Sequence, residues 1–406
     1  MGVAGNRDDL DDRRIHMRLL LAATAVAVLA ACSSTADDRA TLLAASIEVE
    51  RAPVDPASPV DELVAAINET GLDLLVAQPD DAASVLSPIS IVRTVLMARA
   101  AADGPTGEAI DAALGLPTGD AAHEAWNALD AELRSAAGTA EAFDGTPTPV
   151  VELAGRIWPT TTAEPDQAWI DLLARFHGAD VETIDAGDPS GSRDRINEWV
   201  AGRTNDLIPE LLPEGFIDGR TELVLTDAVY FRAEWRTIFG KYGPETGPFT
   251  RLDGSEVDVE YLVDLEQPGP RGAGDGWVGA QIPYLGDEFA MVLIVPDGGR
   301  FAELRQRLAD GLLDEVDATM TTGPFELRMP EWSTDASIDL AGWLTEIGAA
   351  PGRYPGIGPG VVLEDGVHGA DITVDEVGTE AAAATALDFT ESGPPEPELV
   401  VAAERP

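Results

Sequence analysis

Apolar residues recur every three to four positions along much of the chain, which is the spacing of one buried helix face. Gly104 and Pro105 interrupt this pattern and mark a break between two of the helices. The helical pattern covers residues 60–76, 89–102, 108–114, 193–201, 207–212 and 338–347.

Runs typical of β-strands are concentrated later in the chain. They cover residues 222–231, 256–263, 277–282, 289–295 and 325–329. Because helices come mostly early and strands mostly late, the order predicts an α+β fold rather than an alternating parallel sheet. No repeat and no second long linker divides residues 60–406, so we expect one domain there.

Residues 374–385 combine small side chains with a single Gly378 and no proline. In an extended chain, one face would carry only small uncharged side chains, namely Thr379, Ala381, Ala383 and Thr385. Such a face could enter a sheet between two strands without overpacking it. A short helix is the alternative, because alanine is the best helix former. The segment therefore fits either a helix or a loop that can become a strand.

The composition narrows the classes of partner. The chain has 406 residues, 45% of them hydrophobic, which is enough for a large core. Its formal net charge of -47 argues strongly against nucleic acid as a partner, because phosphate binding depends on clustered Lys and Arg.

The residues that usually carry enzyme chemistry form no recognisable motif. The four histidines have no cysteine partner at metal-binding spacing; they are His16, His123, His177 and His368. No glycine-rich phosphate loop follows a strand. A dispersed Ser-His-Asp triad stays open, but no nucleophile-elbow motif supports one. We therefore expect no enzyme activity, no metal site and no cofactor.

The amino-terminal segment has the pattern of a secretory signal. An apolar run at residues 19–31 follows Met17 and Arg18 and is too short to span a bilayer. Its charged start and small-residue end are typical of a signal peptide. The acidic residues before Met17 suit such a signal badly, so Met17 is the alternative start.

Residues 29–32, Leu-Ala-Ala-Cys, resemble the lipobox of bacterial lipoproteins, in which the cysteine is lipidated. An ordinary signal peptide with an incidental Cys32 is the alternative. The lipobox resemblance implies removal of residues 1–31 and a lipidated amino terminus with a flexible tether at residues 32–59. It also implies an extracytoplasmic protein that is anchored to the cell membrane and faces outward.

A resemblance to a known family is carried by six segments in order, at residues 86–90, 196–200, 223–235, 282–284, 291–296 and 368–385. Together they resemble the serpin family of protease inhibitors. Leu86–Ser90 is similar to the opening of the family's second helix, and residues 196–200 resemble the helix across the main sheet.

This resemblance implies a fold and a mechanism. The fold has three β-sheets, about nine helices and an exposed reactive-centre loop at about residues 376–397. A target serine protease, with a cysteine protease as the alternative, cleaves the loop and forms an acyl-enzyme. The loop then inserts into the main sheet and deforms the protease. The expected protein is a monomer that acts as an inhibitor and not as a catalyst.

Roles for loop residues follow from the same resemblance. The hinge comprises Glu376, Gly378, Thr379, Glu380, Ala381, Ala382, Ala383, Ala384 and Thr385. The attacked bond lies at Ser392-Gly393 for a loop of ordinary length, although prolines follow it. The alternative cleavage residues are Leu387, Phe389, Thr390 and Glu391.

Four further residues correspond to the gate beneath the main sheet, namely Ser87, Ser90, Asp227 and His368. The structural alternative is a Ser-Pro helix cap and a core histidine. Asp227 stands where the family usually has Asn, so we expect it to be paired or protonated if it is buried.

The end of the chain departs from the family. Serpins continue past the loop with two strands of a core sheet, and this sequence stops at Pro406, where that segment should begin. We expect these strands to be missing, which leaves an incomplete record or an inactive truncated product as open alternatives. A serpin-fold surface binding protein that does not inhibit is the other alternative, and the small residues at 381–384 argue against it.

Overall fold

The computed structural model describes residues 50–79, 84–239, 245–379 and 399–405. The helices in these residues are α1 (Val60–Ala77), α2 (Pro88–Arg99), α3 (Gly104–Leu114), α4 (Ala121–Ala136), α5 (Gln167–His177), α6 (Pro189–Arg203), α7 (Phe301–Ala309), α8 (Leu312–Thr319) and α9 (Leu340–Glu346). The predicted α+β class, with about nine helices and three sheets, is confirmed in the described part of the chain.

The strands form one two-stranded and two six-stranded sheets. The two-stranded sheet pairs β1 (Ala140–Glu141) with β2 (Pro147–Thr148). One six-stranded sheet has the order β14-β10-β7-β8-β9, with β6 also paired to β7. Its strands are β6 (Glu245–Thr250), β7 (Glu256–Gly274), β8 (Trp277–Pro283), β9 (Ala290–Pro296), β10 (Thr321–Pro330) and β14 (Val400–Ala402).

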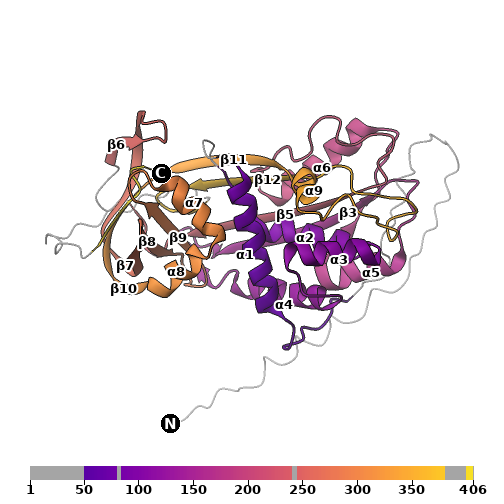
Figure 1. The fold of residues 1–406 in the computed structure, drawn as a ribbon, viewed down its shortest axis with the longest axis horizontal. Coiled ribbons are helices and arrows are strands. Elements are labelled where there is room, and N and C mark those ends of the chain that lie inside the picture. Colours follow the sequence, from indigo (N-terminus) through magenta and orange to yellow (C-terminus); the bar gives the residue numbers. More distant parts are fainter. Residues whose placement is uncertain (1–49, 80–83, 240–244, 380–398, 406) are drawn as a thin grey trace, which may run out of the picture. The chain divides into compact units, whose positions relative to one another are not determined.

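The other six-stranded sheet has the order β11-β12-β13-β5-β3-β4. Its strands β11, β12, β5 and β3 are labelled in Figure 1. Its strands are β3 (Val150–Pro159), β4 (Asp180–Val181), β5 (Leu223–Glu234), β11 (Trp332–Asp339), β12 (Val367–Val374) and β13 (Gly378–Thr379). We call it the main sheet. The largest cluster of buried apolar residues joins its strands β3 and β11 to helices α1 to α5 and α9.

Helix α2 lies beneath β5 and begins with a side-chain cap. The Ser87 hydroxyl accepts a hydrogen bond from the Ser90 N–H, and Pro88 occupies the first helical position. Its apolar residues Ile91, Val92, Leu96 and Met97 are almost completely buried. The helix is therefore a fixed support under the main sheet.

One predicted helix is absent, and the first two residues of another belong to strand β11. Residues 207–212 form no helix, because Asn197 binds this backbone from α6: its amide donates to the Leu212 carbonyl and accepts from the N–H groups of Leu211 and Leu212. The predicted helix at 338–347 begins only at Leu340, where the Asp339 carboxylate caps α9.

Part of the predicted tether contacts the folded domain. The Arg51 guanidinium donates to Asn127 and Asp130 of α4 and to the Phe176 carbonyl of α5. Ala52 is buried and hydrogen-bonded to α5 through the Arg175 carbonyl. Within the described residues, no helix has the length and apolar character needed to cross a membrane.

Candidate functional site

The hinge residues Gly378 and Thr379 form β13, a two-residue strand inside the main sheet. Gly378 and Thr379 pair with Glu234 and Ala233 of β5, and Thr379 also pairs with Val374 of β12. A Cβ atom at residue 378 would lie 2.1 Å from the Ala233 carbonyl oxygen. Only glycine fits here, because any side chain would push β13 away from β5.

The turn between β12 and β13 is held by Asp375. Its carboxylate accepts hydrogen bonds from the N–H groups of Val377 and Gly378, at 2.9 and 3.0 Å. The Trp235 indole N–H donates to the Asp375 carbonyl, and the Trp235 backbone N–H donates to the Val377 carbonyl. These contacts connect the turn to the end of β5 and direct Thr379 into the sheet.

The Thr379 side chain is 5% exposed and has one specific partner. Its hydroxyl lies 2.6 Å from the Tyr284 hydroxyl. The Tyr284 ring stacks on Trp235, with ring centroids 4.5 Å apart. Burial raises the pKa of Tyr284 to about 12, so its hydroxyl stays protonated at neutral pH. The pocket around Thr379 therefore fits a small hydroxyl side chain.

Beyond β13, no strand among the described residues lies between β5 and β12. Among the described residues, β5 pairs only with β3 and β13, and β12 pairs only with β11 and β13. A cavity of about 840 Å³ lies along this gap and is lined by residues of α2, β5 and β12, with Thr379 among them. The backbone edges of β5 and β12 that face the gap could receive another strand.

Two of the four predicted gate residues meet where α2 begins. The Ser87 N–H donates to Nε2 of His368 on β12, at 3.0 Å. His368 is 6% exposed, and burial lowers its pKa to about 4, so the ring is neutral and can accept this bond. Ser87, Ser90, Asp227 and His368 all line the cavity.

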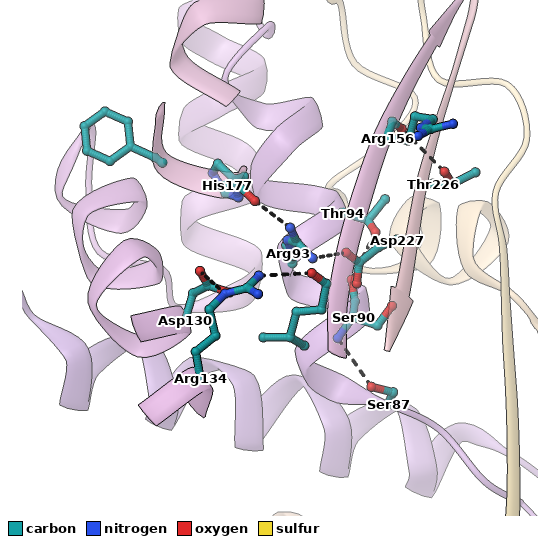
Figure 2. Close-up of polar contacts among 12 residues, drawn as sticks. Ser87, Ser90, Arg93, Thr94, Asp130, Arg134, Arg156, His177, Thr226 and Asp227 are labelled. Atoms are coloured by element: carbon teal, nitrogen blue, oxygen red, sulfur yellow. Dashed lines mark hydrogen bonds and ion pairs between the residues drawn. The ribbon is translucent and has the colours of Figure 1, made fainter. Parts of the chain in front are cut away.

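Asp227 is buried and paired with an arginine. The Asp227 carboxylate accepts a hydrogen bond from the Arg93 guanidinium, as Figure 2 shows. The contact is 2.6 Å long, and both side chains are almost fully buried. Burial raises the pKa of Asp227, whereas Arg93 and Ser90 lower it. Burial is the largest of these influences, so the pKa of Asp227 lies above its usual value. Separation from Asp227 would leave the Arg93 guanidinium unpaired in the core, which is costly.

Other predicted site residues lie outside the described part of the chain. These are Cys32, Glu380, Ala381, Ala382, Ala383, Ala384, Thr385, Leu387, Phe389, Thr390, Glu391, Ser392 and Gly393. Glu376 is described: its carbonyl accepts the Phe239 N–H at the turn before β13. The segment between Thr379 and Leu399 connects β13 in the main sheet to β14 in the other six-stranded sheet.

No cluster of three or more potential metal ligands occurs within the described residues. His123 and His177 meet in the core, with Nδ1 of His123 2.9 Å from Nε2 of His177. Burial lowers the pKa of both rings, to about 4 for His123 and well below its usual range for His177. Both rings are therefore neutral at neutral pH.

Sequence reasoning missed three residues that build this site: Arg93, Tyr284 and Asp375. The sequence offered a clue to Arg93, because it is the only charged residue between two apolar runs of α2. A buried aspartate elsewhere in the chain would need a positively charged partner of this kind. Tyr284 lay within a segment that resembles the family, but nothing in its local sequence indicates contact with Thr379.

A protein-family model described as Serpin (serine protease inhibitor) matches residues 65–406. The chain is 28% identical over 342 residues to an uncharacterized serpin-like protein of Thermococcus kodakarensis, covering 82% of this chain and 77% of that protein. It is 31% identical over 329 residues to putative serpin-Z6A of Oryza sativa subsp. japonica, covering 75% and 82%.

A third relative is the leukocyte elastase inhibitor of Equus caballus, with 26% identity over 319 residues and coverage of 74% and 82%. Among solved structures, the native state of the thermophilic serpin tengpin superposes with a TM-score of 0.74. That match covers 88% of this chain and 90% of tengpin at 20% identity, so it bears on the fold alone.

Proposed function

Because the chain belongs to the serpin family, whose model is described as serine protease inhibitor, we propose that it traps serine proteases by inserting a cleaved loop into the main sheet. The observation that carries this proposal is β13. Gly378 and Thr379 already occupy the end of the gap between β5 and β12, where the two strands have no other described partner between them.

The chemistry needs only a peptide bond from this chain. The protease serine Oγ attacks the loop carbonyl, the peptide bond breaks with release of the new amino terminus, and an ester joins the loop to the protease. Water would normally hydrolyse this ester. Insertion of residues after Thr379 between β5 and β12 carries the ester-linked protease away and distorts its active site before hydrolysis occurs.

The residue roles follow from the geometry at β13. Glu376, Gly378 and Thr379 mark the start of the hinge, and residues 381–384 follow into the gap, where their small side chains avoid overpacking. The gate residues Ser87, Ser90, Asp227 and His368 line the floor of that gap. The proposed cleaved bond is Ser392-Gly393, with the alternatives named above.

Incubation of the chain with a panel of serine proteases tests this proposal. We expect a covalent complex that survives boiling in denaturant, and release of a peptide whose mass identifies the cleaved bond. A cysteine protease belongs in the panel, because its thioester would give the same type of complex. Complete cleavage by every protease without a complex would contradict inhibition and favour the non-inhibitory or inactive alternatives.

The proposed location rests on the amino-terminal sequence. Lipidation of Cys32 after removal of residues 1–31 would anchor a monomeric inhibitor to the outer face of the cell membrane. Expression with a labelled fatty acid tests this: label and membrane association should be present in the natural chain and absent from Cys32→Ala. Incorporation of label into the Cys32→Ala chain would contradict the assignment.

A further inference from the structure

Helix α2 contacts both strands that border the gap in the main sheet. Near its start, the Ser87 N–H binds His368 of β12 at 3.0 Å. Further along the helix, the Arg93 guanidinium binds Asp227 of β5 at 2.6 Å. Two facing strands are therefore attached from below to one rigid element.

Arg93 also contacts the helices α4 and α5. Its second guanidinium nitrogen donates to the His177 carbonyl at the end of α5, at 2.6 Å, and its guanidinium lies 5.1 Å from the centre of the Trp126 ring of α4. Figure 2 shows Arg93 between His177 and Asp227. One buried side chain thus links α2, α4 and α5 to β5.

The fit of Arg93 depends on a glycine in the neighbouring strand. A Cβ atom at Gly155 of β3 would lie 3.2 Å from the Arg93 guanidinium and 3.5 Å from the Met97 sulfur. Gly155 pairs directly with Asp227, so β3 leaves open the space in which the ion pair forms. The pair is accommodated by three elements and is not a chance surface contact.

Insertion of a strand must change this arrangement. A new strand between β5 and β12 moves them apart by about one interstrand spacing, about 4.8 Å. The contacts of Asp227 and His368 with α2 cannot both keep their present lengths during that movement. Separating a buried charged pair is far more costly than breaking one neutral hydrogen bond.

We propose that Arg93 is a positioning residue whose ion pair with Asp227 slows the separation of β5 from β12, and so restrains the main sheet until the loop is cleaved. This inference rests on the proposed insertion mechanism and adds a residue that controls its rate.

The test measures insertion directly in the full chain. The loop is cut with a metalloprotease, which forms no acyl-enzyme, and pulsed hydrogen exchange with mass spectrometry follows amide protection in β5 and β12. The double variant Arg93→Gln with Asp227→Asn has a neutral pair at this position. After the cut, we expect its β5 and β12 amides to become protected from exchange about ten-fold faster than those of the natural chain. The double variant avoids leaving one unpaired charge in the core.

The matched control is a second ion pair of the same helix. Arg99 of α2 binds Asp111 of α3 through two guanidinium nitrogens, at 2.8 and 2.6 Å, and neither residue lies on a strand that borders the gap. Arg99→Gln with Asp111→Asn should lower stability and leave the insertion rate unchanged. A general loss of stability would instead accelerate both double variants equally, which would overturn the proposal.

A second variant keeps the test decisive if the double variant Arg93→Gln with Asp227→Asn does not fold. Arg93→Lys keeps the buried charge but lacks the forked donors that reach Asp227 and the His177 carbonyl together, so insertion should be about three-fold faster. Insertion at the natural rate in the variants that fold would overturn the role of Arg93 and leave the proposed function intact. A cut natural chain that never gains protection in β5 and β12 would contradict both.

Discussion

At the scale of single residues, Thr379 is the side chain whose surroundings are most closely defined. It is buried between β5 and β12 and shares a short hydrogen bond with Tyr284, which itself stacks on Trp235. The pocket holds a small uncharged side chain with a hydroxyl. A charged side chain placed in this buried pocket would lose its hydration.

We therefore predict that Thr379→Arg converts an inhibitor into a substrate. The loop would still be cleaved, but an arginine at this buried position would displace β13 and hinder entry of the residues that follow it, so the ester would be hydrolysed first. Electrophoresis under denaturing conditions should show cleaved chain and little covalent complex, whereas the control Thr379→Ser should resemble the natural chain. Unchanged complex formation by Thr379→Arg would show that the pocket does not limit insertion.

His368 gives a prediction for acid stability. Its pKa is about 4 in the folded chain and about 6.5 when unfolded, so the unfolded chain binds the proton more tightly. The neutral His368 ring therefore contributes fully to the unfolding free energy above pH 6.5, and this contribution is lost as the pH falls toward 4. Between pH 7 and pH 5, this ring lowers the unfolding free energy by about 2 kcal/mol.

Denaturant titrations at both pH values measure that loss. His368→Gln keeps an acceptor for the Ser87 N–H and has no titrating ring, so its unfolding free energy should fall by about 2 kcal/mol less than that of the natural chain. The carboxylates and the His123–His177 pair are common to both proteins and cancel in the comparison. Parallel acid profiles would contradict the role of His368.

At the scale of elements, β13 is short, and its place in the sheet depends on the absence of a side chain at Gly378. Gly378→Ala should displace β13, because its Cβ would meet the Ala233 carbonyl oxygen. We expect a loss of about 1–3 kcal/mol in unfolding free energy and faster hydrogen exchange at Thr379. Gly202→Ala in α6 is the control, since nothing lies within 4 Å of that Cβ and the helix gains propensity.

At the scale of the whole molecule, the chain carries a formal charge of -47. Part of this charge surrounds the hinge: burial raises the pKa of Glu331, and the carboxylates of Glu376, Glu260 and Asp375 raise it further. Acidic side chains are thus gathered where β13 enters the main sheet. Such a surface attracts positively charged proteases over a distance set by the salt concentration.

We predict that association with a basic protease slows several-fold when the salt concentration rises from about 50 to about 200 mM. Stopped-flow measurement of complex formation gives the rate. Cleavage of a small uncharged substrate by the same protease is the control for direct effects of salt on the enzyme. An association rate independent of ionic strength would exclude steering by the acidic surface.

The sequence alone determined the fold class, the strands β5, β7, β8, β9 and β10, and the small side chains of the hinge, because hydrophobic spacing and local composition are written along the chain. It failed where distant residues decide, as at residues 207–212, where Asn197 takes backbone groups that a helix would have used. Only the tertiary structure paired Arg93 with Asp227 and Thr379 with Tyr284. Such pairs lie far apart in sequence, and a buried polar group finds its partner only once the surrounding core has formed.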